Sequence, residues 1–350
     1  MEITRFNNED IRKEENAINS RTIFISKITI VIPVYQSDAT IESLVESVIE
    51  NLQLLFKNID IVLVNDGSKD GSHKKAMNLE KAMNLVKKYP GILKYVRLSR
   101  NFGEHNAVMC GLRFASGDFV AIIDDDFQNP PEEIINLAAK IIEGYDVVYG
   151  YYATKKHNWF RNLGSAFNNW TASKLLNKPT DLYLSSFKLM NAYIVKKVTE
   201  YKGPYPYLDG LILQSTNAIA SVRVKHSKRL QGRSNYTFRR LIQLWASMTT
   251  GFSVKPLRIA SIFGFIMSAF GLLLAAYFII AWKAGGIILS HPIPPGWASL
   301  IVTITVFSGL QLMILGIIGE YLGRLFMTAA GKPQFVVRDV FGFEDNGRSI

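Results

Sequence analysis

The chain has 350 residues, and its 40 Lys and Arg residues outnumber the 29 Asp and Glu residues to give a formal net charge of +11. Charged residues make up 20% of the chain and the mean hydropathy is +0.11, which indicates that part of the chain lies in lipid. The composition excludes disorder and collagen-like repeats. A disulfide scaffold is excluded because Cys110 is the only cysteine. A single cysteine also indicates a reducing compartment, and the positive charge predicts an anionic partner.

The first 27 residues are predicted to form a polar arm without a signal peptide, because charged residues interrupt every apolar stretch. From residue 28 to about residue 152, short β-rich runs alternate with helical stretches. This alternation is typical of βαβ units and a mainly parallel sheet. Strands are predicted at 28–34, 59–64, 94–98 and 119–123, and helices at 41–56, 74–89 and 134–143. No GxGxxG sequence follows the first strand, so a dinucleotide-binding fold is not expected.

The residues that follow each strand are informative, because ligands of open parallel sheets bind beyond the carboxyl ends of the strands. The first strand ends in Pro33-Val34-Tyr35, and the second is followed by Asn65-Asp66-Gly67-Ser68. Asp66 is therefore a candidate acceptor of hydrogen bonds from a nucleobase or a ribose. An ordinary Asp-Gly turn is the alternative.

Three adjacent carboxylates, Asp124, Asp125 and Asp126, directly follow the strand predicted at 119–123. They repel one another at a cost that a bound divalent cation would remove. Asp124 and Asp126 are expected to point to the same side, with Gln128 as a further oxygen ligand, and such hard ligands suit Mg²⁺ or Mn²⁺. The alternative is an acidic turn that caps the next helix.

Two uncharged apolar runs, 259–282 and 297–319, are long enough to cross a bilayer, since the first would span about 36 Å as a helix. Glycines and prolines separate them, which predicts a transmembrane hairpin; two buried helices of a soluble domain are the alternative. Seven basic residues flank the pair and only Lys283 lies in the connecting loop, so both termini are expected in the cytoplasm. An amphipathic pattern at 235–258 predicts a helix in the membrane interface, or one packed on the globular domain.

Five motifs in chain order resemble family 2 glycosyltransferases of the GT-A fold: Pro33-Val34-Tyr35, Val64 to Ser68, Arg100 to Gly103, Asp124 to Pro131 and Tyr145 to Gly150. More narrowly, the chain resembles polyprenyl-phosphate glycosyltransferases, the dolichyl- or undecaprenyl-phosphate mannosyl- and glucosyltransferases.

The resemblance covers roughly residues 28 to 332 and implies an α/β GT-A catalytic domain with a Rossmann-like, mainly parallel sheet. The domain order that it implies is a polar arm at 1–27, the GT-A domain at 28–234, an interfacial helix at 235–258, a two-helix transmembrane hairpin at 259–322 and a cytoplasmic tail at 323–350. The protein would then be an integral inner or plasma membrane protein with a cytoplasmic catalytic domain.

The resemblance also implies site residues by position. The implied nucleotide-sugar-binding residues are Pro33, Tyr35, Asp66, Asp124 and Asp125. The implied ligands of the metal and the diphosphate are Asp124, Asp126 and Gln128.

Two places depart from the family pattern. Where many relatives have Gly-Asp-Phe-Arg, this chain has Ser185-Ser186-Phe187-Lys188, so that Ser186 replaces an Asp and Lys188 replaces an Arg. Tyr151 and Tyr152 follow Tyr149-Gly150, where relatives often carry an Arg.

These departures do not exclude catalysis, because a polyprenyl phosphate is already largely dianionic at neutral pH and needs no strong general base. Transfer does need a cation on the departing diphosphate and basic groups that position the acceptor phosphate. The candidates for the latter are Arg161, Lys188, Arg229 and Arg233, each of which taken alone is more typical of a surface charge. Asp209 is a candidate base, a sugar-hydroxyl acceptor or a helix cap. The predicted catalytic residues are Asp124, Asp126, Asp209 and Lys188.

The sequence therefore predicts a membrane-anchored, metal-dependent, inverting glycosyltransferase that moves a hexose from a nucleotide sugar to undecaprenyl phosphate. UDP-glucose is the first expected donor, and the product would be a lipid-linked sugar for cell-surface glycosylation. One alternative is a processive polysaccharide synthase, although the chain lacks a Gln-x-x-Arg-Trp motif. Another is a non-catalytic membrane scaffold or flippase partner. A homo-oligomer stays open, and a nucleic-acid partner is not expected because the basic excess collects around the apolar runs.

Overall fold

The computed structural model describes residues 27–35, 41–53, 55–67, 72–152, 182–225, 255–283 and 297–343. The chain divides into two compact units. The first comprises Met1–Tyr236 together with Lys332–Ile350, and the second comprises Thr237–Gly331.

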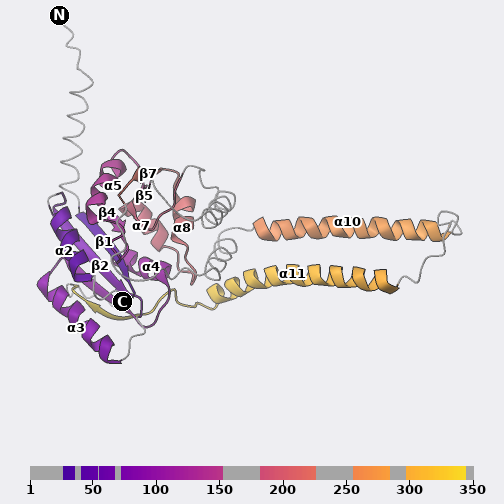
Figure 1. Cartoon of the computed structure of the whole chain (residues 1–350), viewed down its shortest axis with the longest axis horizontal. Helices are drawn as coiled ribbons and strands as arrows, with labels where there is room; N and C mark the ends of the chain where they lie inside the picture. The colour runs from indigo at the N-terminus through magenta and orange to yellow at the C-terminus, as the bar shows by residue number, and fades with distance from the viewer. Residues whose placement is uncertain are drawn as a thin grey trace, which may run out of the picture. The chain divides into compact units, whose positions relative to one another are not determined.

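The first unit is built from alternating strands and helices (Figure 1). Its elements are β1 (Lys27–Val34), α2 (Ile41–Leu52), β2 (Asn58–Asn65), α3 (Ser72–Lys88), β3 (Leu93–Leu98), α4 (Glu104–Phe114), β4 (Phe119–Ile122), the 3₁₀ turn η1 (Pro131–Glu133), α5 (Ile134–Ile141), β5 (Val147–Tyr151), β6 (Lys188–Asn191), α7 (Ala192–Thr199), α8 (Leu208–Ser215), β7 (Ile219–Arg223) and β8 (Val337–Phe341).

The eight strands form one sheet in the order β7-β5-β6-β4-β1-β2-β3-β8. The central strands β4, β1, β2 and β3 are parallel, as are β5 and β7. Antiparallel pairing occurs where β6 lies between β4 and β5, and where β8 pairs with β3. The predicted α/β fold with a mainly parallel sheet is confirmed.

The central strands are apolar along their length because helices cover both faces of the sheet. In β1, Ile30 and Val31 are both fully buried although successive side chains point to opposite faces. Ile30 belongs to the core cluster that α2 and α5 cover, whereas α4 covers the face that carries Val62. Gly111 of α4 lies so close to the sheet that a Cβ there would stand 2.3 Å from a Val31 methyl group.

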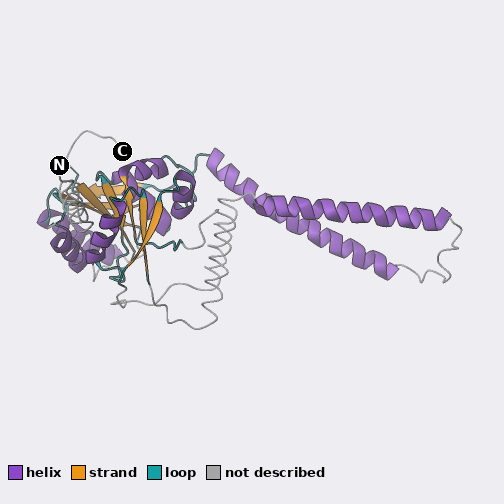
Figure 2. Ribbon diagram, turned by 90° about the horizontal axis from the view of Figure 1, so that it is seen from above, coloured by secondary structure: helices purple, strands orange, loops and turns teal. Residues whose placement is uncertain are grey.

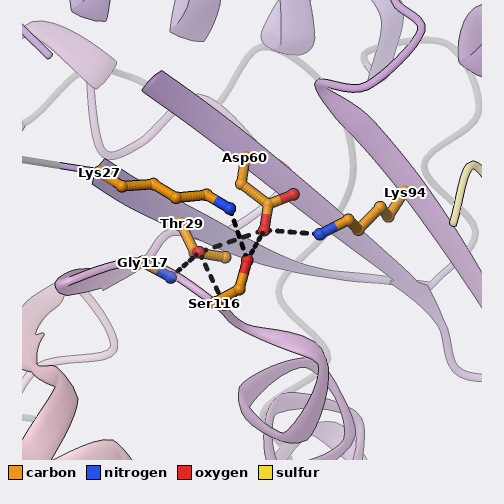
Figure 3. Close-up of polar contacts among 6 residues, drawn as sticks. All are labelled: Lys27, Thr29, Asp60, Lys94, Ser116 and Gly117. Carbon is orange, nitrogen blue, oxygen red and sulfur yellow. Dashed lines mark hydrogen bonds and ion pairs between the residues drawn. The ribbon is translucent and has the colours of Figure 1, made fainter. Parts of the chain in front are cut away.

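A buried polar cluster joins the N-terminal ends of the central strands (Figure 3). Its centre is Asp60 on β2, which is 2% exposed. The Asp60 Oδ2 atom accepts hydrogen bonds from the Thr29 hydroxyl at 3.3 Å, the Ser116 hydroxyl at 2.9 Å and the Lys94 ammonium at 2.8 Å. The Thr29 oxygen in turn accepts the Gly117 N–H at 2.9 Å. The cluster thus links β1, β2, β3 and the turn before β4.

The strand β8 departs from the tail expected at 323–350. Residues 337–341 pair with β3 at the edge of the sheet, Arg97 and Asp339 form an ion pair across the two strands, and the Phe341 ring lies 6.2 Å from the Tyr95 ring. This strand has no local sequence signal, because it is short and its partner lies more than 200 residues earlier in the chain. Residues 337–341 therefore belong to the sheet.

The second unit contains α10 (Lys255–Lys283) and α11 (Trp297–Ala329), which lie side by side (Figure 2). Among the described residues, one helical stretch, Val306–Ala329, has the length and apolar composition needed to cross a membrane. The apolar stretch Leu257–Gly271 in α10 is shorter. The predicted pair of transmembrane helices therefore remains a prediction. Most of the helix predicted at 235–258 lies outside the described residues, and α10 already begins at Lys255.

Candidate active site

The candidate site lies where the central strands end. Tyr35 follows β1, Asp66 follows β2, and the three aspartates follow β4 shortly after its last paired residue. Because these strands are parallel neighbours, their carboxyl ends meet at one edge of the sheet. The Tyr35 N–H donates to the Asp125 Oδ2 atom at 3.2 Å, so the ends of β1 and β4 are in direct contact. Pro33 lies inside β1, beside Val64 of β2.

Asp124 is held by two hydrogen bonds. Its Oδ2 atom accepts the Ser186 hydroxyl at 2.6 Å and the Asn129 side-chain N–H at 3.1 Å. Burial raises the pKa of the Asp124 carboxyl, the Ser186 bond lowers it, and the charges of Asp126 and Asp125 raise it further. Sequence reasoning assigned no role to Ser186, because its contact with Asp124 joins residues that are 62 positions apart.

A tight turn follows Asp124. Phe127 has φ +59°, which is uncommon for a residue with a side chain, and its ring packs partly buried against the main core. The Asp126 Oδ1 atom accepts the Gln128 N–H at 3.0 Å, which closes the turn. The Asp126 charge raises the pKa of Asp124, and both residues belong to this one short turn. The turn therefore gathers the predicted metal ligands at one place.

The donor atoms at this turn suit a hard cation. Within the described residues, no group of three His, Cys, Asp or Glu residues forms a metal-binding cluster. Mg²⁺ in nucleotide enzymes is commonly held by one or two carboxylates together with substrate phosphates and water, so a complete protein cage is not required. The crowded negative charge on Asp124 and the oxygen ligands of Asp126 and Gln128 fit such a cation.

Asp66 joins the loops that follow β2 and β3. Its two carboxylate oxygens accept the N–H groups of Phe102 at 2.7 Å and Gly103 at 2.9 Å, and the residue is 3% exposed. Burial raises its pKa and these two hydrogen bonds lower it. At Gly67, with φ +57°, a Cβ would lie 2.1 Å from the Arg100 backbone, so only glycine fits. The structure thus gives Asp66 a bracing role, and its contact with a nucleotide stays a prediction.

Lys188 and Asp209, expected separately as a phosphate-binding cation and a candidate base, form an ion pair with each other. The Lys188 side chain is 3% exposed and the Asp209 side chain 13%. The Tyr149 hydroxyl donates to the same Asp209 oxygen at 2.9 Å, and the Lys188 ammonium lies 4.9 Å from the centre of the Tyr149 ring. Burial and the Asp209 charge raise the pKa of Tyr149 well above its usual value. The tyrosine therefore stays protonated and donates to the pair.

His105 and Tyr207 border this pair, and sequence reasoning assigned neither of them a role. His105 lies in the first turn of α4, and its ring meets the Tyr207 ring edge-on at 5.5 Å. Burial lowers the pKa of His105, the Asp209 charge raises it and the Lys188 charge lowers it. The only available signal was the position of His105 two residues after the motif Arg100 to Gly103.

Tyr152 contacts Asn129, one of the residues that hold Asp124. Its hydroxyl donates to the Asn129 side-chain oxygen, and burial raises its pKa to about 12. Both departures from the family pattern, Ser186 and Tyr152, are thus connected to Asp124. The remaining predicted site residues, Arg161, Arg229 and Arg233, lie outside the described residues.

The chain is similar to known glycosyltransferases. Residues 29–199 match the family described as Glycosyl transferase family 2. The undecaprenyl-phosphate 4-deoxy-4-formamido-L-arabinose transferase of Proteus mirabilis (strain HI4320) is 31% identical over 318 residues, which cover 91% of this chain and 95% of that protein. The uncharacterized glycosyltransferase YkcC of Bacillus subtilis (strain 168) is 32% identical over 324 residues, which cover 91% of this chain and 95% of that protein.

Among solved structures, the chain matches the glucosyl-3-phosphoglycerate synthase of M. tuberculosis with a TM-score of 0.45 and 18% sequence identity. The similarity covers 66% of this chain and 82% of that chain. From the family match and the relatives that align along almost the whole chain, the protein belongs to glycosyl transferase family 2. The predicted family is confirmed, together with its α/β fold and mainly parallel sheet.

Proposed function

We propose that this protein transfers a sugar from a nucleotide donor to undecaprenyl phosphate, with inversion at the sugar carbon and with Mg²⁺ or Mn²⁺ as cofactor. The observation that carries the proposal is the set of carboxylates gathered after β4, where Asp124 is fixed by Ser186 and Asn129. Relatives named as undecaprenyl-phosphate transferases align over 91% of the chain, including the apolar helices beyond the family domain. That coverage favours the same class of acceptor.

In the proposed reaction, an oxygen of the acceptor phosphate forms a bond to the anomeric carbon while the bond from that carbon to the nucleotide diphosphate breaks. Asp124, Asp126 and Gln128 would hold the cation, which neutralises charge on the departing diphosphate. The acceptor oxygen is already anionic at neutral pH, so no side chain has to remove a proton from it. This is compatible with the pairing of Asp209 to Lys188 and Tyr149.

The acceptor phosphate needs cations near the reacting carbon. Lys188 is buried against Asp209, so we assign it to shaping the site and leave the direct phosphate contacts to Arg161, Arg229 and Arg233. Each of these arginines has a guanidinium group whose paired N–H groups match the geometry of a phosphate.

We place the catalytic unit and both termini in the cytoplasm, with α10 and α11 spanning the inner or plasma membrane. The large apolar side chains of α11 support this, because Leu312, Leu322 and Phe326 are each more than 60% exposed and lipid would cover them. The chain topology also supports it. Residues before α10 and after α11 belong to the same unit, so the segment between them crosses a bilayer an even number of times or not at all.

The proposal is tested with the full-length protein in lipid nanodiscs that contain undecaprenyl phosphate. A panel of UDP- and GDP-sugars is added with Mg²⁺, Mn²⁺ or chelator, and the lipid fraction is analysed by mass spectrometry. UDP-glucose is the first donor tested. UDP-4-deoxy-4-formamido-L-arabinose is the second, because the relatives' names contain that sugar. We expect one donor to give a glycosylated lipid phosphate that disappears with chelator.

The matched variants are Asp124→Asn and Asp118→Asn. Both replace a carboxylate with an amide next to β4, but Asp118 is exposed at the opposite end of that strand. Asp124→Asn should lower transfer by about 10²-fold or more, the size of effect seen when one electrostatic contact to a transition state is lost. Asp118→Asn should retain transfer. Absence of lipid product with every donor, or full activity of Asp124→Asn, would overturn the proposal.

A further inference from the structure

Both hydrogen bonds that Asp124 accepts within the described residues go to the same carboxylate oxygen. The Ser186 hydroxyl and the Asn129 amide both donate to Oδ2, at 2.6 Å and 3.1 Å. These two contacts restrict rotation of the carboxylate about its Cβ–Cγ bond. Oδ1 is then left as the oxygen available to a ligand.

The Asn129 side chain is itself fixed. It is 1% exposed, it donates through Nδ2 to Asp124, and its Oδ1 atom accepts the Tyr152 hydroxyl. A flipped amide would place its oxygen against the Asp124 carboxylate and its N–H groups against a hydroxyl that needs an acceptor. Burial and the two partners together therefore define one orientation of the amide.

The side chains of Ser186, Asn129 and Tyr152 are uncharged. Asp124 is followed directly by Asp125 and Asp126, so three carboxylates lie at one turn. Hydroxyl and amide donors stabilise the carboxylate without adding a positive charge that would compete with a cation for it. The Lys188 charge also acts on Asp124, but Ser186, Asn129 and Tyr152 themselves leave the charge of this carboxylate for a cation.

We propose that Ser186, Asn129 and Tyr152 are positioning residues that hold Asp124 in one orientation, so that Oδ1 binds the cation of the nucleotide complex. The inference rests on the proposed function, because it assumes a cation at this turn. It assigns a role to both positions at which the chain departs from the family pattern. Supporting residues of this kind typically change metal affinity or activity by about 10- to 100-fold when they are removed.

The test measures Mn²⁺ binding without turnover. Full-length protein in nanodiscs without undecaprenyl phosphate is titrated with Mn²⁺ in the presence of UDP, and free Mn²⁺ is followed by electron paramagnetic resonance. We expect Ser186→Ala to weaken Mn²⁺ binding by about 10-fold or more, and Ser186→Thr to restore most of it because the hydroxyl is kept. Tyr152→Phe, which removes the hydroxyl that donates to Asn129, should have a smaller effect in the same direction.

A double-variant cycle tests the relay, that is, whether Tyr152 acts on Asp124 through Asn129. Because the Tyr152 hydroxyl fixes the Asn129 amide, adding Tyr152→Phe to Asn129→Ala should weaken Mn²⁺ binding by less than Tyr152→Phe does alone. Additive effects of the two substitutions would overturn the relay.

The controls remove the same groups elsewhere in the domain. Ser47→Ala deletes a hydroxyl on α2, and Tyr193→Phe deletes the hydroxyl of an exposed tyrosine on α7. Both should bind Mn²⁺ like the wild type. Thermal unfolding of every variant identifies any that fails to fold, and Ser186→Thr and Tyr152→Phe are the variants least expected to do so.

The inference is overturned if Ser186→Ala binds Mn²⁺ as tightly as the wild type, or if the wild type binds no Mn²⁺ with UDP or GDP. The Mn²⁺ titration does not depend on sugar transfer, so the two proposals can fail separately. If Ser186→Ala loses Mn²⁺ but no donor gives a lipid product, the proposed reaction fails and the positioning role stands.

Discussion

The Lys188 ammonium on β6 contacts the Asp209 carboxylate on α8, and both groups are removed from water. The Tyr149 hydroxyl on β5 donates to the same Asp209 oxygen. Two strands, β5 and β6, and the helix α8 are thereby joined at one buried oxygen. A charge pair in such a position is costly to separate, because either partner left alone is a buried ion without compensation.

Removing one member of this pair should destabilise the catalytic unit. We expect Asp209→Ala or Lys188→Met alone to lower the free energy of unfolding by about 3–5 kcal/mol, and the double variant Lys188→Met/Asp209→Leu to recover part of it. Denaturant unfolding of the three variants measures this. If Asp209→Ala were as stable as the wild type, the carboxylate would not be held by the pair.

Cys110 should be unreactive in the folded protein. Burial raises the pKa of its thiol to about 12, so at pH 8 its thiolate fraction is about 10³-fold lower than in an unfolded chain. A chromogenic disulfide reagent should therefore label one thiol only after denaturant is added. Rapid labelling of the native protein at pH 8 would contradict the buried position of α4 against the sheet.

The Asp60 cluster should contribute stability without contributing to catalysis. Asp60→Ala would leave Lys94 without its buried partner, and we expect a loss of about 3–5 kcal/mol in the free energy of unfolding. Asp60→Asn should cost less, because it keeps a hydrogen-bond acceptor. Activity per folded molecule should be unchanged in Asp60→Asn, since Asp60 lies about 20 Å along β2 from Asp66.

Lys88→Ala is the matched control for this experiment. It removes ion pairs with Glu42 and Glu46 that lie on the surface, and unfolding of this variant should stay close to that of the wild type. Equal losses in Asp60→Ala and Lys88→Ala would show that burial of the cluster has no special weight.

The strand β8 should be essential for a soluble catalytic unit. A chain that ends at Gly331 lacks β8 and exposes the backbone of β3 at the sheet edge, so we expect aggregation and loss of nucleotide binding. A chain that ends at Phe343 keeps β8 and should behave like the full-length protein. Size-exclusion chromatography and nucleotide binding of both chains provide the measurement.

A milder test of the same region is Gln334→Ala. The Gln334 amide is 4% exposed, accepts a bond from Arg113 at 2.9 Å and donates to the Gly203 carbonyl at 3.0 Å. Its removal leaves buried polar partners unsatisfied and should lower the melting temperature while β8 is retained. An unchanged melting temperature would mean that water replaces the amide.

Much of the fold was predictable from local sequence patterns. The strands β1 to β4 are continuous apolar runs between polar turns, and their observed bounds differ from the expected ones by at most one residue at each end. The helix expected at 41–56 ends earlier, at Leu52, because the Leu55 and Phe56 N–H groups both turn back to the Leu52 carbonyl. Such helix ends depend on single hydrogen bonds, which hydrophobic periodicity does not contain.

The strands β6 and β8 were not predictable in this way. Each has only four or five residues, and each is antiparallel to neighbours that lie far away in the sequence. Their pairing is decided by the completed sheet and not by their own residues.

The acidic part of the site was predictable and its supporting contacts were not. Adjacent carboxylates after a strand are visible in the sequence of Asp124 to Asp126. The bond from Ser186 and the pairing of Lys188 with Asp209 depend on where β6 and α8 lie, so they required the structure. Residue types alone suggested separate roles for Lys188 and Asp209, because a charge in isolation looks available to a ligand.

The position of β8 also constrains how the protein is made. The ribosome synthesises β3 before both apolar helices and β8 after them. Domains generally begin to fold during synthesis from their N-terminal part. Here the edge of β3 stays unpaired in the nascent sheet until α10 and α11 have left the ribosome. Translation of the helices thus comes before the final folding step of the catalytic unit, and a chain stalled within them carries an incomplete sheet.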